Sequence, residues 1–246
     1  MKAKADRLWV GTSGWYYNHW IGRFYPEDLD KKDWLDFYCR HFSTVEINAT
    51  FYRMPFENMV RGWASRAPEG FRYAVKGNRR ITHLKKLVGV DEDLRDYFRR
   101  IELLGDRLGV ILWQLPPSLH EDTERLQSFL ARLPREMKHA VEFRHRSWLQ
   151  PRVYAVLEKF NVACVSVSSS RMPADFTVTA DFVYYRFHGL GGGYAHDYTR
   201  TELEPWAAQA RKALREGRTV FAYFNNDAEA RAPKNARELM RMILAR

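Results

Sequence analysis

The 246-residue sequence has little cysteine and no long apolar run, and each shortage excludes a class of protein. Its two cysteines, Cys39 and Cys164, cannot build a disulfide framework or a cysteine-based zinc site. Apolar runs such as residues 110–113 are far too short to cross a bilayer. Residues 1–10 contain basic side chains but no apolar segment of the kind that directs secretion. We therefore expect a cytoplasmic protein with no membrane partner.

The sequence also lacks any run of five or more basic residues, although it is basic overall. It contains 40 Lys and Arg against 30 Asp and Glu, a formal net charge of +10. A hydrophobic content of 46% excludes an intrinsically disordered chain. A basic balance favours acidic partners such as phosphorylated small molecules or nucleic acid. Charge alone leaves both open, because the same residues can also be spread over solvated helix faces.

Eight short segments rich in β-forming residues recur along the sequence, and a helical stripe of apolar residues lies between most of them. The predicted strands are residues 8–15, 44–51, 72–78, 108–115, 139–145, 163–169, 182–189 and 219–226. Thr201 and Glu204 have the spacing of a capping box, which predicts a helix that continues through Trp206. Residues 170–181 contain Pro173 and no apolar stripe. We therefore expect the helix between the sixth and seventh strands to be reduced or missing.

Alternating strands and helices predict a single α/β domain over residues 1–246, either a closed (β/α)8 barrel of the TIM type or an open doubly wound sheet. Central strands of a doubly wound sheet are continuously apolar, because helices cover both of their faces. Several strands here carry polar residues at every second position, which places each set on one face. These sets are Glu46, Asn48 and Thr50; Glu142 and Arg144; Cys164, Ser166 and Ser168; and Arg186 and His188. The lumen of a closed barrel accommodates such faces, so we predict the TIM-like barrel with parallel strands.

Active sites of parallel barrels lie where the strands end, because the loops that leave the strands gather at that mouth. The predicted strands end on three cations and two anions: Lys76, Arg144 and Arg186, against Glu46 and Glu142. One positive charge remains uncompensated, and an anionic ligand would balance it. The alternative is a purely structural ionic network that caps the core, since buried ions must be paired or solvated.

Four ionisable residues at this mouth are candidates for catalysis, namely Glu46, Glu142, His188 and Lys76. We expect Glu142 or Glu46 to act as general base and His188 as general acid, in a hydrolase, an isomerase or a lyase. Lys76 or Arg186 would stabilise developing negative charge. A Schiff base at Lys76 would need a depressed pKa, so an ion pair between Lys76 and one of the glutamates is the simpler expectation.

Candidates for substrate binding surround these residues. Gly191, Gly192 and Gly193 follow the seventh strand, where such barrels often bind phosphate and where glycine lets backbone N–H groups approach an anion. Trp15 and Tyr52 follow the first two strands, and aromatic rings there can stack on a sugar or a base. The other candidates are polar residues at strand ends: Arg144, Arg186, Asn48, Gln114 and Asn225.

Two carboxylates and one imidazole could also hold a divalent metal ion in an open site. The nearby cations Lys76, Arg144 and Arg186 argue against a metal, because they would repel it and occupy the carboxylates. We therefore predict no metal and no cofactor.

Six sequence motifs fall at or near the predicted strand ends and lead from one end of the chain to the other. They are VGTSGW at residues 10–15, VEINATFY at 45–52, LWQLPP at 112–117, VEFRH with SW at 141–148, YRFHG at 185–189 and YFNN at 223–226. Together they resemble the DUF72 family, also called YecE-like, over nearly the whole chain. The resemblance implies a single-domain TIM-like barrel. It implies no reaction, because the family is known mainly as a domain of unknown function.

The residues at the mouth therefore predict an enzyme that binds a small anionic, phosphorylated substrate and uses carboxylate and imidazole acid–base chemistry. A protein that binds or cleaves nucleic acid across the basic barrel end is the first alternative. A binding module without catalysis, in which the polar ring is structural, is the second. Barrel folds support many activities, so the choice depends on the geometry of the site.

Overall fold

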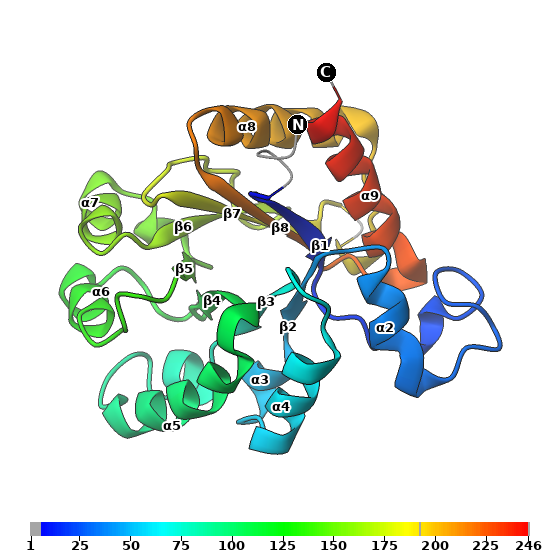
Figure 1. The fold of residues 1–246 in the computed structure, drawn as a ribbon. Coiled ribbons are helices and arrows are strands. Elements are labelled where there is room, and N and C mark those ends of the chain that lie inside the picture. The colour runs from blue at the N-terminus through cyan, green and yellow to red at the C-terminus, as the bar shows by residue number, and fades with distance from the viewer. Residues whose placement is uncertain (1–5, 192, 246) are drawn as a thin grey trace.

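Strands and helices alternate along the chain in the computed structural model, which describes residues 6–191 and 193–245. The strands are β1 (Leu8–Thr12), β2 (Thr44–Ile47), β3 (Arg72–Lys76), β4 (Leu108–Gln114), β5 (His139–Glu142), β6 (Ala163–Ser169), β7 (Phe182–Gly189) and β8 (Thr219–Phe224). The helices are α2 (Trp34–Cys39), α3 (Ala49–Tyr52), α4 (Glu57–Arg66), α5 (Asp91–Ile101), α6 (Thr123–Leu130), α7 (Pro151–Lys159), α8 (Arg200–Arg215) and α9 (Arg231–Leu244). Figure 1 shows the strands as a central ring with the helices outside it.

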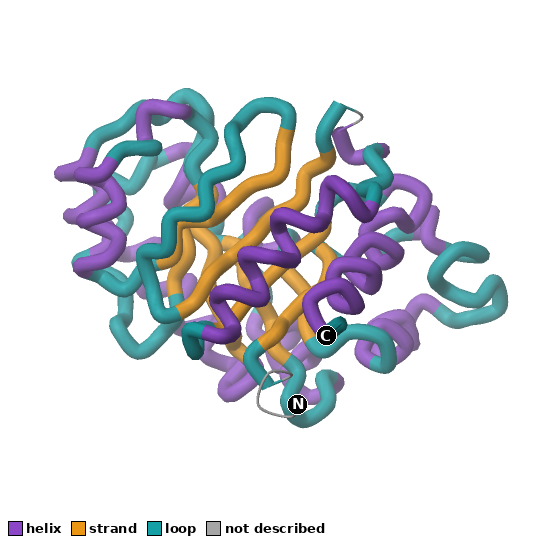
Figure 2. Tube along the Cα trace, turned by 90° about the horizontal axis from the view of Figure 1, so that it is seen from above, coloured by secondary structure: helices purple, strands orange, loops and turns teal. Residues whose placement is uncertain are grey.

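The eight strands form one sheet in the order β1-β8-β7-β6-β5-β4-β3-β2, and each neighbouring pair in this order is parallel. Its two edges meet just past β1, where Ser13 bridges to Glu46 and the backbone N–H of Gly14 donates to the Glu46 carbonyl over 2.8 Å. In the view of Figure 2 the strands run obliquely inside the layer of helices. The sheet is thus a nearly closed barrel, which confirms the predicted TIM-like fold class.

The second strand ends earlier than the sequence predicts, because the chain turns into the short helix α3 after Asn48. Thr50 therefore lies on a helix, and its hydroxyl donates to the carbonyl oxygen of Lys76 over 2.6 Å. The prediction that Asn48 and Thr50 extend the polar strand face of Glu46 is wrong. The early helix instead places the ring of Phe51 below the Lys76 ammonium, with 4.2 Å between Nζ and the ring centroid.

The sixth strand presents the opposite face to the lumen from the one the sequence predicts. Val165 packs in the inner core with residues of the other strands, whereas Cys164 belongs to the outer core. Residues 170–181 join β6 to β7 without a helix, and the backbone N–H of Cys164 donates to the Thr179 hydroxyl over 2.8 Å. The prediction that Cys164, Ser166 and Ser168 face the lumen is wrong, because an extended polar segment covers this part of the barrel in place of a helix.

The capping box of helix α8 lies two residues earlier in the chain than the sequence predicts. The side chain of Thr199 accepts a hydrogen bond from the backbone N–H of Glu202, and the Glu202 carboxylate accepts one from the backbone N–H of Thr199. Thr201 and Glu204 therefore lie inside the helix, and the prediction of a box at these two residues is wrong. The same residue types, placed two positions earlier, satisfy the free N–H groups of the first turn.

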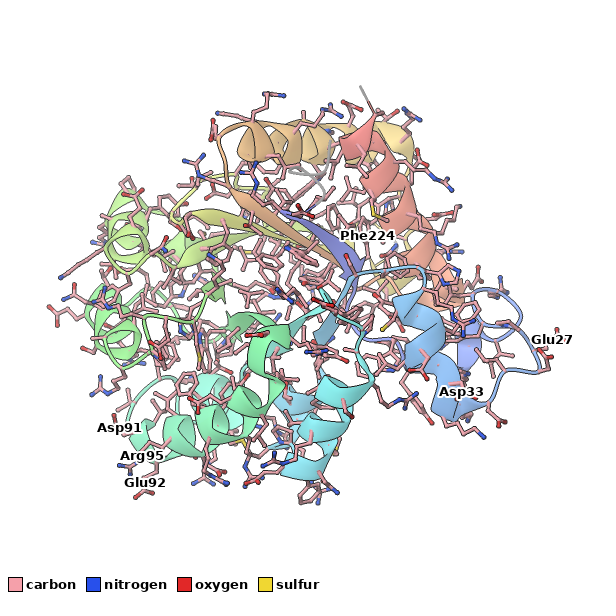
Figure 3. All side chains as sticks on the ribbon, in the orientation of Figure 1. Glu27, Asp33, Asp91, Glu92, Arg95 and Phe224 are labelled. Atoms are coloured by element: carbon pink, nitrogen blue, oxygen red, sulfur yellow. The ribbon has the colours of Figure 1, made fainter. Side chains whose placement is uncertain are left out.

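Charged side chains gather on the outside of the molecule. Figure 3 shows several of them at the periphery, pointing away from the barrel: Glu27, Asp33, Asp91, Glu92 and Arg95. In the part of the chain that the structure describes, no helix is long and apolar enough to cross a membrane. The helices bury their apolar stripes against the strands, which leaves the inward charged residues at the barrel mouth as the exception that needs explanation.

Candidate functional site

A buried arginine on β7, Arg186, joins the two carboxylates that the sequence places at the mouth. Its Nη2 donates to Oε1 of Glu46 on β2 over 2.6 Å, and its Nη1 donates to Oε2 of Glu142 on β5 over 2.5 Å. Arg186 is 1% exposed and both glutamates are 0% exposed. Burial lowers the pKa of Arg186, but the charges of Glu142 and Glu46 outweigh burial and raise that pKa above its ordinary value. The three residues form a charged bridge across the lumen.

The carboxylate of Glu46 has donors on both oxygens. The Ser13 hydroxyl donates to Oε1 over 2.6 Å, and the Tyr184 hydroxyl donates to Oε2 over 2.6 Å. Burial would raise the pKa of Glu46, but the charge of Arg186 and these hydrogen bonds hold it below its ordinary value. The Ser13 hydroxyl is therefore committed to a carboxylate.

The carboxylate of Glu142 is surrounded more densely. Besides Arg186, the Gln114 amide donates to Oε1 over 3.1 Å, and Nε of Arg144 lies 2.5 Å from the same oxygen. Nε2 of His188 lies 3.1 Å from it as well. Burial would raise the pKa of Glu142, but the charges of Arg144 and Arg186 hold it well below the ordinary value. Both glutamates are thus charged, compensated and fully engaged.

The imidazole of His188 is neutral near pH 7. Burial lowers its pKa to about 4, and the opposing charge of Glu142 does not compensate. Nε2 lies 3.0 Å from Nη2 of Arg144, and Nδ1 lies 3.3 Å from Nδ2 of Asn225. A general acid needs a proton to give at the working pH, so these surroundings do not favour the predicted acid role of His188.

Lys76 is not paired with either glutamate. It is 8% exposed, and among the described residues its ammonium has no hydrogen bond or ion pair, only the contact with the ring of Phe51. The expectation of an ion pair with Glu46 or Glu142 is wrong, because Arg186, Ser13 and Arg144 already occupy those oxygens. Burial, with the charge of Arg186 second, lowers the pKa of Lys76 to about 7.

A pocket of about 180 Å³ opens beside this network, at the ends of β5, β6 and β7. Its charged or imidazole side chains are Arg144, Arg171 and His188, and no carboxylate is among its lining residues. The rest of the lining is Ser169, Ser170, Gly189, Gly193 and Tyr194. The guanidinium of Arg171 has no ion pair or hydrogen bond with any other described residue. The pocket therefore has an excess of positive charge.

Glycine is required where the chain leaves β7. Gly189 has φ +86°, and a Cβ added there would lie 1.7 Å from the carbonyl oxygen of Gly193, which folds back over it. The backbone N–H of Gly189 donates to the Tyr198 hydroxyl over 2.9 Å. Gly191 is exposed, Gly193 lines the pocket, and Gly192 lies outside the described residues. The loop's close turn thus shapes one wall of the pocket.

Three further candidates make no hydrogen bond or ion pair with the charged bridge among the described residues. Trp15 lines a separate surface pocket with Trp63, whose ring meets it edge-on at 6.4 Å between centroids. Tyr52 is 67% exposed and contacts the ring of Phe51 at 5.0 Å between centroids. Asn48 has a buried Oδ1 with no hydrogen-bond partner. The structure therefore brings together the charged candidates, Gln114 and Asn225, but not the two aromatic ones.

No group of three or more His, Cys, Asp and Glu side chains could hold a metal ion within residues 6–191 and 193–245. Glu46, Glu142 and His188, the trio considered from the sequence, instead contact Arg186 and Arg144. These residues do not fit a divalent ion, because two guanidinium groups occupy the positions that it would need.

Four residues of the site escaped the sequence analysis. Tyr184 shares the two-residue period of Arg186 and His188 on β7, so the same pattern could have identified it. Arg171 lies in the segment without a helix, where no periodicity indicates direction. The sequence pattern places Phe51 at the end of a strand, and His83, on the short π-helix Arg80–Leu84, approaches its ring to 4.8 Å between centroids.

The whole length of the barrel matches one protein family. Residues 9–246 match the family described as "Protein of unknown function DUF72". This chain belongs to the DUF72 family. That description carries no substrate, reaction or cofactor, so the family membership agrees with the resemblance in the motifs and adds no chemistry.

Two DUF72-related bacterial proteins are similar in sequence. The UPF0759 protein YunF of Bacillus subtilis is 26% identical over 96% of this chain and 94% of its own length. The UPF0759 protein YecE of Escherichia coli K12 is 30% identical over 56% of this chain and 48% of its own length. Both names leave the chemistry open.

Solved DUF72 structures have the same fold. A DUF72 family protein from Thermotoga maritima superposes with a TM-score of 0.88 at 29% identity, covering 96% of this chain and 98% of that one. Another from Enterococcus faecalis gives a TM-score of 0.82 at 20% identity, covering 96% and 95%. The second likeness shows the fold alone.

Proposed function

We propose that this DUF72 protein is an enzyme that binds a small anionic, phosphorylated substrate at the barrel mouth. The lining of the 180 Å³ pocket carries the proposal, because Arg144, Arg171 and His188 face it without a carboxylate. Its volume suits a compound of a few heavy atoms rather than a large cofactor. Guanidinium groups bind phosphate and carboxylate oxygens in a fixed, two-pronged geometry, which favours an anion here.

The charged bridge of Glu46, Arg186 and Glu142 supports a positioning role for the two glutamates. Glu46 and Glu142 have depressed pKa values and a donor on every oxygen, so they are weak bases. Glu142 holds Arg144 at the edge of the pocket through the 2.5 Å ion pair. The ion pair with a buried carboxylate holds that guanidinium in place before any ligand arrives.

The acid–base role then passes to Lys76. A group exchanges protons most effectively when its pKa lies near the working pH, and the pKa of Lys76 is about 7. The charge of Arg144, which lines the pocket, is among the influences that lower that pKa. The charge of Arg144 therefore acts both on the amine of Lys76 and on any ligand in the pocket.

Anion binding is tested by calorimetric titration with inorganic phosphate and with dihydroxyacetone phosphate at low salt. Arg171→Ala should weaken binding by about 10- to 100-fold, because a hydrogen bond to a charged group contributes about 1.5–3 kcal/mol. The matched control is Arg218→Ala, which removes the same charge beside the start of β8, at the other end of the barrel. The affinity of Arg218→Ala for both phosphate compounds should equal that of the wild type.

Equal affinity in all three proteins, or no saturable binding to the wild type, would contradict the proposal. The same titration with a DNA oligonucleotide tests the nucleic-acid alternative. Oligonucleotide binding that falls steeply with salt while phosphate fails to bind would favour that alternative.

A further inference from the structure

The amine of Lys76 has no counterion among residues 6–191 and 193–245, and the backbone that carries it is held in position. Its backbone carbonyl accepts from Thr50 over 2.6 Å, and the N–H of the next residue, Gly77, donates to the Leu112 carbonyl over 2.8 Å. A Cβ at Gly77 would come within 2.3 Å of the buried Trp113 ring, so the backbone of this strand end has no room to shift. The backbone that carries the Lys76 side chain is therefore fixed at the mouth.

The surroundings of the amine disfavour its charged form. Arg186 and Arg144 repel it, while Glu142 and Glu46 attract it from a distance, already compensated by the arginines. His83, the nearby imidazole, has a pKa lowered to about 4 and carries no charge near neutrality. Burial adds the largest influence, so the pKa of Lys76 is about 7 and much of the amine is neutral at physiological pH. A neutral amine is the nucleophilic form.

We propose that Lys76 forms a Schiff base with a small aldehyde or ketone that carries an anionic group, which Arg144 and Arg171 hold in the adjoining pocket. The inference rests on the proposed function, because the anion site is what brings the carbonyl compound to the amine. Arg144 joins the two places, since it lines the pocket and pairs over 2.5 Å with Glu142, whose strand β5 is separated from the strand of Lys76 only by β4.

The reaction balances without any further reagent. The Nζ lone pair attacks the carbonyl carbon, a C–N bond forms, and the carbonyl π electrons move to oxygen. The resulting carbinolamine then loses its oxygen as water, which takes the two protons that nitrogen gives up, and a C=N bond remains. The product is an imine that draws electrons from the neighbouring carbon, the chemistry that a lyase or an isomerase of carbonyl compounds uses.

The test traps the imine as a stable secondary amine. Wild-type protein at about pH 7.5 is incubated with dihydroxyacetone phosphate and sodium borohydride, and the adduct is located by intact-mass and peptide mass spectrometry. We expect one adduct, at Lys76, formed at least about tenfold faster than with uncharged dihydroxyacetone, since the anion contacts contribute at least about 1.5 kcal/mol. Lys76→Met and Lys76→Arg should both lose it.

Lys138 is the matched control. Its Nζ also lies over a phenylalanine ring, 4.9 Å from the centroid of Phe182, but it is ion-paired with Asp181 at 3.1 Å. Lys138→Met should retain the full adduct. Thermal melting of each variant shows that a lost adduct does not result from unfolding.

An adduct that persists in Lys76→Met, or none on wild-type protein that still binds inorganic phosphate, would overturn the Schiff base and leave the anion site standing. Equal labelling by the charged and uncharged probes, with no phosphate binding, would overturn the anionic substrate class and the proposed function with it.

Discussion

The two ends of the barrel each hold a lysine over a phenylalanine ring, and the two lysines differ in what else surrounds them. Lys138, beside the larger hollow of about 770 Å³ where the strands begin, is ion-paired with Asp181 at 3.1 Å. Lys76, at the mouth, has no carboxylate partner among the described residues and a pKa of about 7. The size of a hollow therefore says little about reactivity. Counterions and burial account for the difference between the two lysines.

A second contrast lies within the mouth, between Arg186 and Lys76. Both are buried basic side chains at the barrel mouth, on β7 and β3, yet only the arginine is held by two carboxylates. A guanidinium cannot shed its proton in a protein, so burying it demands compensating charge. A lysine can neutralise instead, and its pKa falls. Because both glutamates pair with Arg186, Lys76 has no carboxylate partner among the described residues.

Replacing Arg186 should have the largest effect on the stability of the fold. Arg186→Ala leaves Glu46 and Glu142 buried without their bridging charge, so we expect the free energy of unfolding to fall by about 3–5 kcal/mol. Urea denaturation measures this loss. Arg171→Ala, an exposed arginine without an ion pair, should change stability by less than about 0.5 kcal/mol. A loss below about 1 kcal/mol in Arg186→Ala would mean that the carboxylates do not depend on it.

The next effect is the contribution of Lys76 to the pH dependence of stability. Its pKa is 10.5 in the unfolded chain and about 7 in the fold, so between those values the unfolded state binds the extra proton. Stability should therefore rise with pH through this window, by up to about 1.4 kcal/mol per pH unit. Below it, the buried charge destabilises the fold, and Lys76→Met should be more stable than wild type.

Urea denaturation of wild type and Lys76→Met from about pH 6 to 9 measures this difference, in which all other titrating groups cancel. The advantage of the variant should shrink steadily as the pH rises. Lys138→Met should instead lose less than about 1 kcal/mol at every pH, as expected for an exposed pair. A difference between wild type and Lys76→Met that does not change with pH would contradict a perturbed amine.

Much of this arrangement could be predicted from the sequence. Alternating polar residues and strand ends placed Glu46, Glu142, Arg186 and His188 at one mouth, because parallel strands all end on the same side and the two-residue period fixes their face. The barrel follows from the same pattern. These inferences depend on backbone geometry, which a local pattern specifies.

The pairing at the mouth could not be predicted in the same way. Whether Glu46 meets Lys76 or Arg186 depends on side-chain reach across the lumen, and β2 and β7 are far apart in sequence. The face of β6 was misjudged for a related reason. Its polar residues recur at every second position, which predicts that they face the lumen. The backbone N–H of Cys164 instead donates to Thr179, from a segment with no regular pattern. Distant partners, rather than local periods, decided both outcomes.

The smallest expected effect concerns the ring of Phe51, which lies below the amine of Lys76. The Phe51 face attracts the ammonium at 4.2 Å, so it stabilises the charged form. Phe51→Leu keeps the site apolar but removes that attraction, of about 0.5–1 kcal/mol, and should lower the pKa of Lys76 by roughly half a unit. The midpoint of the pH dependence of borohydride trapping measures it, with Phe182→Leu beside Lys138 as the unchanged control. A midpoint that moves upward would mean that the ring acts mainly by excluding water from the amine, since a wetter amine holds its proton more tightly.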